Sequence, residues 1–188
     1  MAYLSREALE AMGFARLGRN AKISDKASIY EPEKMEIGDY CRIDDFCVVS
    51  GRIAMGRNVY IGPLCLVAGG TPGITFDDFT TLAYHAQVFS QSDDYSGATM
   101  ANPTVPAAYK SETKEAVHLK RHSIVGAGAI VGPGVVLAEG TAVGTGGVVL
   151  RSTEPWSIYT GIPAMKLKDR RRELLTLEKD YLRSKSQE

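Results

Sequence analysis

Apolar side chains recur along this chain with a period of six residues, which is neither the 3.6 of a helix nor the two of a strand. The run is unbroken from Leu119 to Val149, and three phase shifts extend it back to Leu17. The positions group in threes: Leu17, Ile23, Ile29; Ile37, Ile43, Val49; Met55, Ile61, Val67; Phe76, Leu82, Val88; Leu119, Val125, Val131; Leu137, Val143, Val149.

The position four residues after each apolar one holds mostly small side chains. Cys41, Cys47 and Cys65 all fall on it, without the CxxC spacing of a metal or redox site. We therefore interpret the cysteines as small buried packing residues. Gly or Asp often follows the apolar residue, as at Gly38 and Asp44, and such residues suit turns.

A period of six predicts a short strand and a turn, repeated. Three such units make one triangular coil, with the aliphatic side chains inside and the small ones in tight corners. Neighbouring coils then pair as parallel strands about 4.8 Å apart, so six coils form a prism about 29 Å tall. The sequence predicts an all-β solenoid over residues 17–163, in which each coil packs only on its neighbours.

Residues 1–16 are predicted to form a helical cap over the first coil. The segment SREALEAM at residues 5–12 is typical of a short helix, with Ser5 as its N-cap and Glu7 in its first turn.

Two further segments leave the repeat. Residues 89–118 break the hexad and contain two prolines, and they predict a long loop extruded from the prism. Residues 164–188 are predicted to form a C-terminal helix that packs on the prism or on a neighbour. Its apolar stripe consists of Leu174, Leu175, Tyr181 and Leu182.

The segment IVGAGAIVGPGVVLAEGTAVGTGGVV, followed by YTGIPAMKLKDR, resembles the hexapeptide-repeat acyltransferases, which fold as a left-handed parallel β-helix. The resemblance covers about residues 17–170. It implies the left hand, whereas the general crossover rule favours the right. It also implies a homotrimer with active sites between subunits. Outward apolar residues such as Val48 and Leu66 agree with a trimer, although scattered surface apolars also occur on monomers.

The resemblance implies transfer of an acetyl or other acyl group from coenzyme A, with acetyl-CoA as co-substrate. The donor is expected to lie in the groove between two prisms, near the last coils. Lys166, Lys168 and Arg170 carry charges that suit the phosphates of the nucleotide end. The matching donor residues are Gly126, Ala127, Gly128, Ala129, Thr145 and Gly146, with Pro163 at the chain reversal.

An alcohol or ammonium must lose a proton as it attacks the thioester, so a general base is useful. Many sugar O-acetyltransferases of this family carry a histidine in the loop after the position of Val88, and this chain has none there. His85, Asp93 or Asp94 is the candidate base. Mutual repulsion between the two adjacent carboxylates is expected to raise one pKa. We expect direct attack without an acyl-enzyme, because the cysteines lie inside the coils.

The string SQSDDYSG, followed by NPTVP, is similar to family members that acylate sugars or sugar nucleotides for cell-surface polysaccharide. Tyr95, Asn102 and Tyr109 are then candidates to bind the sugar. The residues leave open which acceptor is used, whether O or N is acylated, and whether the acyl group is longer than acetyl.

Composition limits the remaining classes of partner and of function. The 22 Lys and Arg balance 22 Asp and Glu, which disfavours a nucleic-acid partner. No apolar stretch approaches the length of a membrane span, and the N-terminus lacks the apolar core of a secretory signal, so a cytoplasmic protein is expected. Two alternatives to acyl transfer are a metal lyase using His85, His118 and His122, and a non-catalytic binding subunit. Because the histidine spacing differs from the lyase pattern, no metal is expected.

Overall fold

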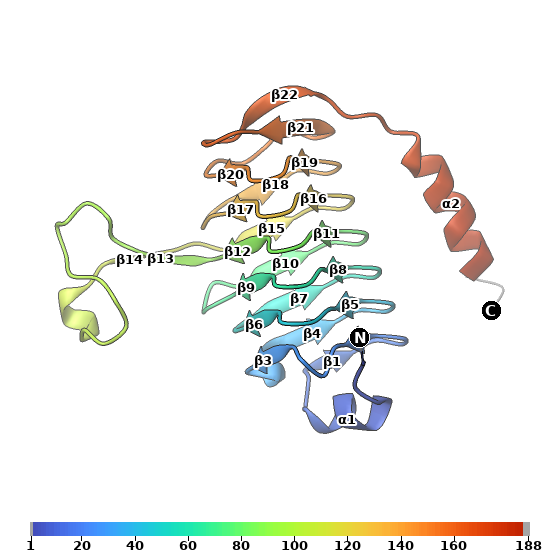
Figure 1. Ribbon diagram of the computed structural model, residues 1–188, viewed down its shortest axis with the longest axis horizontal. Coiled ribbons are helices and arrows are strands. Elements are labelled where there is room, and N and C mark those ends of the chain that lie inside the picture. The colour runs from blue at the N-terminus through green and yellow to red at the C-terminus, as the bar shows by residue number, and fades with distance from the viewer. Residues whose placement is uncertain (1, 186–188) are drawn as a thin grey trace.

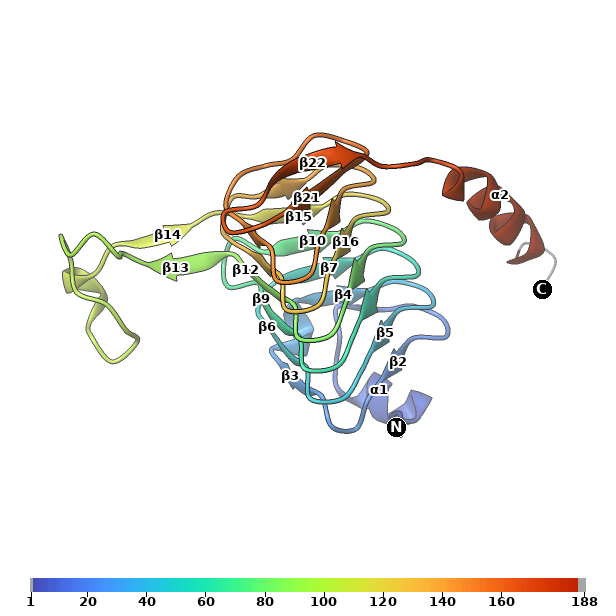
Figure 2. The same ribbon diagram turned by 45° about the horizontal axis from the view of Figure 1, so that its top comes forward.

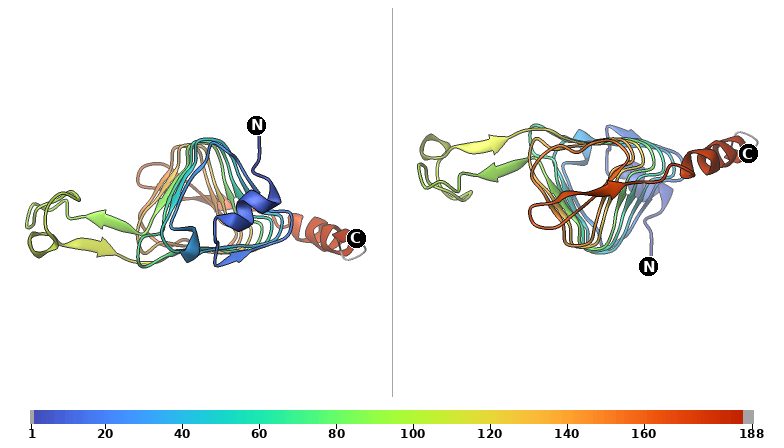
Figure 3. Two further views of the ribbon diagram at one scale, coloured as in Figure 1. Left: turned by 90° about the horizontal axis from the view of Figure 1, so that it is seen from below. Right: turned by 90° about the horizontal axis from the view of Figure 1, so that it is seen from above.

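The computed structural model describes residues 2–185 and shows a parallel β-helix with six complete coils. Viewed along its axis the prism is triangular (Figure 3). Each of its three faces is a sheet to which every coil contributes one parallel strand, and the second sheet has two further strands, the last of them antiparallel. The predicted solenoid and its number of coils are therefore confirmed.

The first sheet contains β1 (Arg16–Leu17), β4 (Met35–Ile37), β7 (Ile53–Met55), β10 (Ile74–Phe76), β15 (Val117–Leu119) and β18 (Val136–Leu137). The second contains β2 (Lys22–Ile23), β5 (Arg42–Ile43), β8 (Tyr60–Ile61), β11 (Thr81–Leu82), β16 (Ile124–Val125), β19 (Ala142–Val143), β21 (Ser157–Thr160) and β22 (Met165–Asp169). The third contains β3 (Ser28–Tyr30), β6 (Val48–Ser50), β9 (Leu66–Ala68), β12 (Gln87–Phe89), β17 (Ile130–Val131) and β20 (Val148–Val149).

The core is the predicted set of stacked apolar columns. From the second coil to the sixth, every predicted inward residue is buried, Val143 being the most exposed at 3%. Leu17 and Ile29 of the first coil are only partly buried, because they lie at the open end. Cys41, Cys47 and Cys65 are buried as predicted, and burial raises the pKa of the Cys41 thiol to about 11.

Tight corners join the sheets. We call the corner between the first and second sheets the first corner, and the corner between the second and third sheets the second corner. At both, the residue three positions after the buried aliphatic usually has a left-handed backbone, whether it is glycine or not. At the first corner these residues are Asn20, Tyr40, Asn58, Phe79, His122 and Gly140. At the second they are Phe46, Leu64, His85, Gly128 and Gly146.

The two ends of the prism are closed differently. Helix α1 (Arg6–Ala11) covers the first coil with Leu9, which is 1% exposed. The Ser5 side chain accepts a hydrogen bond from the Ala8 backbone N–H at 3.2 Å, so the predicted N-cap is confirmed. At the other end β21 pairs with β19, and β22 turns back antiparallel along β21 (Figure 1).

Residues between β12 and β15 leave the prism as an arm rather than as an irregular loop (Figure 2). Strands β13 (Gln91–Asp93) and β14 (Glu112–Lys114) form its antiparallel stem. Two short 3₁₀ turns also occur, η1 (Pro32–Lys34) in the prism and η2 (Ala107–Tyr109) in the arm. The predicted bounds of 89–118 are slightly too wide. Phe89 belongs to β12, and Val117 and His118 belong to β15.

The prediction of a helix from residue 164 is wrong for residues 165–169, which form β22. Helix α2 (Leu174–Lys185) begins ten residues later than predicted. Residues 186–188 of the predicted helix lie outside the described part of the chain.

Helix α2 lies along the first corner, on the opposite side of the prism from the arm (Figure 3). The predicted apolar stripe of Leu174, Leu175, Tyr181 and Leu182 is half-buried, and the Tyr181 ring packs edge-on against Phe79 of the prism. The one buried side chain of the helix is polar. The Glu178 carboxylate accepts hydrogen bonds from Arg121 and, at 3.0 Å, from His122 Nε2.

Candidate active site

One predicted catalytic residue, His85, lies at the second corner together with the donor-binding candidates Gly128 and Gly146. Backbone hydrogen bonds connect its successive coils: Leu64 N–H donates to Asp45, His85 N–H to Pro63, Gly128 N–H to Tyr84 and Gly146 N–H to Ala127, at 2.9 to 3.0 Å. The corner residues therefore form one column along the prism. His85 is exposed in this column on the fourth coil.

The six residues predicted to bind the donor divide into two groups. Ala129 is fully buried, and a Cβ on Gly126 would come within 2.6 Å of the Val143 carbonyl oxygen, so these two serve coil packing. Gly128, Thr145 and Gly146 are exposed, and Ala127 is partly exposed. A Cβ placed on Gly128 or Gly146 would meet no heavy atom of residues 2–185 within 4 Å. Open space therefore lies over the outer face of the fifth and sixth coils.

Pro163 lies in the turn between β21 and β22, at the end of the prism that continues this column. It lines a pocket of about 230 Å³ together with Leu150, Arg151, Ala164 and Met165. Leu150 and Met165 are exposed apolar side chains. This pocket can accept a flat, partly apolar group.

The three predicted phosphate-binding cations differ in what they contact. The Arg170 guanidinium points inward, where it donates hydrogen bonds to the backbone oxygens of His122 and Gly140 at 2.8 and 3.0 Å. Lys166 pairs with Glu154 and Asp169, each at 2.9 Å, and these contacts raise the pKa of its ammonium. Lys168 is exposed on β22. Arg170 therefore supports the fold, whereas Lys168 is available to an anion.

The two predicted carboxylates lie at the outer end of the stem, where Asp93 ends β13 and Asp94 follows it. Asp94 accepts hydrogen bonds from the Ser96 N–H at 2.8 Å and from the Thr99 N–H and hydroxyl. These bonds lower the pKa of Asp94, so the expected rise from like-charge repulsion is wrong for this residue. Asp93 accepts a weaker hydrogen bond of 3.3 Å, from the Asn102 N–H.

The candidate sugar-binding residues are in the outer part of the arm. Tyr95 is 91% exposed and Tyr109 is 63% exposed. The Asn102 side-chain oxygen accepts hydrogen bonds from the Thr104 N–H and hydroxyl, so it shapes a turn. The exposed phenol rings contribute little to the stability of the arm itself and are free to stack on a ligand.

The predicted bases do not meet within one chain. His85 precedes β12, whereas Asp93 ends β13, and the two strands continue outward one after the other (Figure 2). Eight extended residues span roughly 26 Å. The corner and the arm therefore carry different parts of the predicted site.

The three histidines lie at three different places on the prism. His85 is at the second corner, His118 Nε2 lies 2.8 Å from the Asp77 carboxylate on the outer face of the first sheet, and His122 is buried at the first corner. Among residues 2–185, no group of three or more side chains of the metal-binding types is close enough to hold an ion. This arrangement does not favour the metal-lyase alternative.

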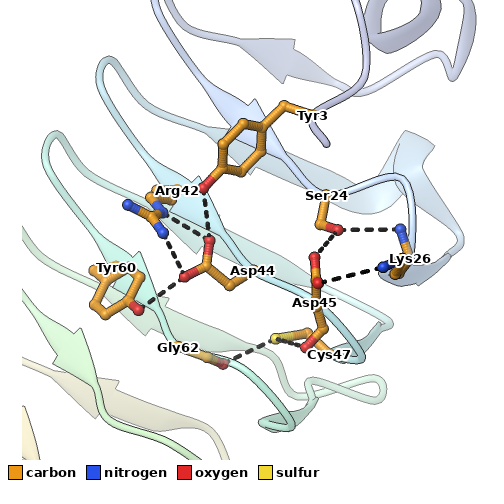
Figure 4. A network of polar contacts seen from close by, with 9 residues as sticks. All are labelled: Tyr3, Ser24, Lys26, Arg42, Asp44, Asp45, Cys47, Tyr60 and Gly62. Carbon is orange, nitrogen blue, oxygen red and sulfur yellow. Dashed lines mark hydrogen bonds and ion pairs between the residues drawn. The ribbon is translucent and has the colours of Figure 1, made fainter. Parts of the chain in front are cut away.

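One polar network was not predicted from the sequence. Asp44 is 1% exposed, and its carboxylate accepts hydrogen bonds from Tyr3, Tyr60 and both arms of the Arg42 guanidinium (Figure 4). Burial acts to raise the pKa of Asp44, and the hydrogen bonds from Arg42, Tyr60 and Tyr3 outweigh it and lower the pKa. The network ties the N-terminal segment to the second and third coils.

A hollow of about 490 Å³ lies elsewhere, over β7 and β10 in the middle of the first sheet and the turn that follows β10. It is lined by Arg16, Asp77, Asp78 and Arg121 among others and contains none of the predicted site residues.

Within residues 2–185, no helix is long and apolar enough to cross a membrane.

Comparison with known proteins gives the same class as the fold. A dTDP-4-amino-4,6-dideoxy-D-glucose acyltransferase from Escherichia coli is 39% identical over 181 residues, covering 95% of this chain and 94% of that protein. The crystal structure of a point mutant of AntD, an N-acyltransferase from Bacillus cereus, in complex with dTDP and coenzyme A superposes with a TM-score of 0.96 at 40% identity, covering 98% of this chain and 100% of that one.

The acetyltransferase domain of PglB from Neisseria gonorrhoeae shares the fold at a TM-score of 0.60 and 16% identity, covering 78% of this chain and 57% of that one. No family model matches the chain.

The left-handed β-helix with an extruded arm defines a hexapeptide-repeat transferase. This chain belongs to the hexapeptide-repeat acyltransferases, the family that its sequence resembles. The prediction of an acyl-CoA-dependent acyltransferase that acts on a sugar or sugar nucleotide is confirmed.

Proposed function

We propose that this enzyme acylates the 4-amino group of a dTDP-linked 4-amino-4,6-dideoxy sugar. The relative from Escherichia coli is named for that acceptor, and AntD has been crystallised with dTDP-4-amino-4,6-dideoxyglucose and coenzyme A. Identity at this level is an average over nearly the whole of both chains. N-acylation rather than O-acylation is therefore the reaction that the similarity favours.

The donor track that we propose runs along the second corner of the fifth and sixth coils. The observation that carries this assignment is the open space over Gly128 and Gly146, where a Cβ would meet no described atom within 4 Å. A pantetheine arm can lie directly on this backbone. The nucleotide end then reaches the pocket beside Pro163, and Lys166 and Lys168, which follow the pocket residue Met165 on β22, are the cations that we propose for its phosphates. The thioester lies at the other end of the track, beside His85.

In the reaction, the neutral amine attacks the thioester carbonyl, the C–N bond forms, and the C–S bond breaks. The proton lost by nitrogen passes to the base, and the coenzyme leaves as the thiolate, which is then protonated. His85, Asp93 and Asp94 are the groups that we propose for this proton. An acyl-enzyme is not needed, and the thiols of Cys41, Cys47 and Cys65 are buried in the core.

We propose that the working enzyme is a homotrimer in which the arm of one copy reaches the second corner of the next. A two-stranded ribbon such as β13–β14 is only marginally stable alone, so contact with a neighbour would stabilise it. Docking would bring Asp93 and Asp94 of one copy toward His85 of the other, with Tyr95, Asn102 and Tyr109 around the sugar. Light scattering is expected to give a mass near three times 20.3 kDa.

We place this reaction in the cytoplasm, as a step toward a cell-surface polysaccharide. Acyl-CoA and nucleotide sugars are both charged, water-soluble metabolites, so both substrates would be dissolved in the same aqueous compartment. The chain has no net charge, and residues 2–185 include no membrane-crossing helix.

The direct test is thioester cleavage, followed as release of free thiol from acyl-CoA. We expect release with dTDP-4-amino-4,6-dideoxyglucose and none with dTDP-glucose, which offers hydroxyls but no amine. Mass spectrometry should place the acyl group on nitrogen. Equal thiol release with the two sugars would show O-acylation, and release with neither would remove the proposed function.

A further inference from the structure

The second corner changes character abruptly between the fourth coil and the fifth. On the second and third coils the column residue is bulky and apolar, Phe46 and then Leu64. On the fourth it is His85, and on the fifth and sixth it is Gly128 and Gly146. Because backbone hydrogen bonds join these coils, each residue lies about 4.8 Å from the next along one line.

Backbone conformation does not explain the change. The φ angles of all five residues lie between 60° and 69°, the left-handed region that favours glycine. Phe46 and Leu64 adopt it with large side chains, for which a positive φ is an outlier. The same positive φ recurs at the first corner, as at Tyr40 and Phe79, so it belongs to the coil geometry and does not by itself decide which residue stands there.

Packing within the chain does not explain it either. A side chain on Gly128 or Gly146 would have room, since no heavy atom of residues 2–185 lies within 4 Å of its Cβ. Conversely, Phe46 and Leu64 are 57% and 54% exposed, so burial in this chain does not reward their bulk. We therefore look for a molecule outside this chain that contacts both the bare glycine backbone and the exposed apolar side chains.

We propose that Leu64 and Phe46 form the surface on which the acyl chain of the donor lies, and that they set its length. The inference rests on the proposed function, which puts the pantetheine on the glycine part of the column and the thioester beside His85. A donor that continues in the same direction carries its acyl carbons past His85 onto the third coil and then the second. An acyl group longer than acetyl meets Leu64 first, and a longer one still reaches Phe46.

The surroundings of these two side chains suit a hydrocarbon chain. Val48, 38% exposed, and the partly exposed Leu66 lie outward at the start of β6 and β9, next to the corner. The Lys26 ammonium lies 5.7 Å from the Phe46 ring and marks the polar limit of the surface. The patch is therefore apolar for two coils and ends in a charge.

The test is a comparison of kcat/KM for acetyl-, butyryl- and hexanoyl-CoA with dTDP-4-amino-4,6-dideoxyglucose as the acceptor. Leu64→Ala is expected to lower the butyryl to acetyl ratio about tenfold, because two methylenes lose their contact. Phe46→Ala is expected to leave that ratio unchanged and to lower the hexanoyl to butyryl ratio. Leu177→Ala is the matched control, since Leu177 is a 69% exposed leucine on α2, and it should change neither ratio.

Unchanged ratios in Leu64→Ala would overturn the inference while leaving the proposed function intact. A fall in oligomeric mass with all donors affected equally would overturn it too, and would assign the patch to contact between copies. If the wild-type enzyme transfers no acyl group to the amino sugar, the proposed function and this inference both fall.

Discussion

Replacing Asp44 by asparagine tests whether the polar network of Figure 4 holds the first coils together. The carboxylate is 1% exposed and accepts four hydrogen bonds of 2.7 to 3.0 Å from Tyr3, Tyr60 and Arg42. The variant keeps the volume and removes the charge. It places an amide N–H₂ against one Arg42 nitrogen and one tyrosine hydroxyl, so the Arg42 bond on that side is lost and the hydroxyl has to turn to accept.

The magnitude depends on the exposure of the partners. Breaking a buried ion pair by removing one member costs about 3–5 kcal/mol when the other member stays buried. The Arg42 side chain is 45% exposed, so water can replace part of what it loses. We therefore expect Asp44→Asn to lower the free energy of unfolding by about 2–3 kcal/mol. For a chain of this size each kcal/mol shifts Tm by about 2–4 °C, which predicts a fall of about 4–12 °C.

Thermal unfolding followed by circular dichroism at pH 7 measures the shift. Asp180→Asn is the control, because that carboxylate is 68% exposed and 3.8 Å from its partner, and its variant should change Tm by less than about 2 °C. The lowered pKa of Asp44 also fixes a pH dependence. Its contribution is complete above the unfolded pKa of about 3.9 and is lost as pH falls through the folded pKa, so wild type and variant should converge in acid. A Tm equal to wild type at pH 7 would refute the role given to the network.

Three further predictions concern other parts of the chain. Gly128→Leu should raise KM for acyl-CoA about tenfold, because its side chain would fill the donor track. Gly13→Leu is the control at an equally open position with positive φ, and it should leave KM unchanged. A KM for Gly128→Leu equal to that of the control would exclude the track. Glu178→Ala should speed amide exchange throughout α2, since 12 residues are too few for a stable isolated helix, and unchanged protection would mean that other contacts hold it. Ser5→Ala should lower the unfolding free energy by about 1 kcal/mol in a denaturant titration through loss of the N-cap, and no shift in midpoint would exclude that contribution.

The prism could be predicted from the sequence because every coil repeats the same local rule. An inward aliphatic and a small corner residue recur regardless of what lies elsewhere in the chain, as from Leu119 to Val149. Burial and pairing then follow coil by coil. The left hand came from the family resemblance, because no local pattern in the hexad specifies it.

The C-terminal segment shows where local rules fail. Residues 165–169 alternate between apolar and charged side chains, Met165, Lys166, Leu167, Lys168 and Asp169, which is the period of a strand. The helical pattern that begins just after this short segment masks its strand signal. In contrast, the inward turn of Arg170 toward His122 and Gly140 depends on contacts 30 to 48 residues away, which sequence spacing cannot reveal.

The candidate site is predictable in its parts and not in its assembly. His85 and Gly128 are recognisable from their places in the hexad, and Asp93 and Asp94 from a family string. Their separation by β12 and β13 appears only in three dimensions. Similarly, Asp44 occupies a position that otherwise favours a turn, and its partners Tyr3 and Tyr60 come from other coils.

Complementation between two inactive variants tests most directly whether the reaction centre lies between copies of the chain. His85→Ala leaves the arm intact, and a chain carrying both Asp93→Asn and Asp94→Asn leaves the corner intact. Each alone should lose most acyl transfer. Unfolded and refolded together in equal amounts, they should recover about a quarter of wild-type activity, because one site in four joins an intact arm to an intact corner across a head-to-tail interface. If each variant is inactive alone and the mixture also stays inactive, with its mass near three chains, the two halves of the site do not come from different copies.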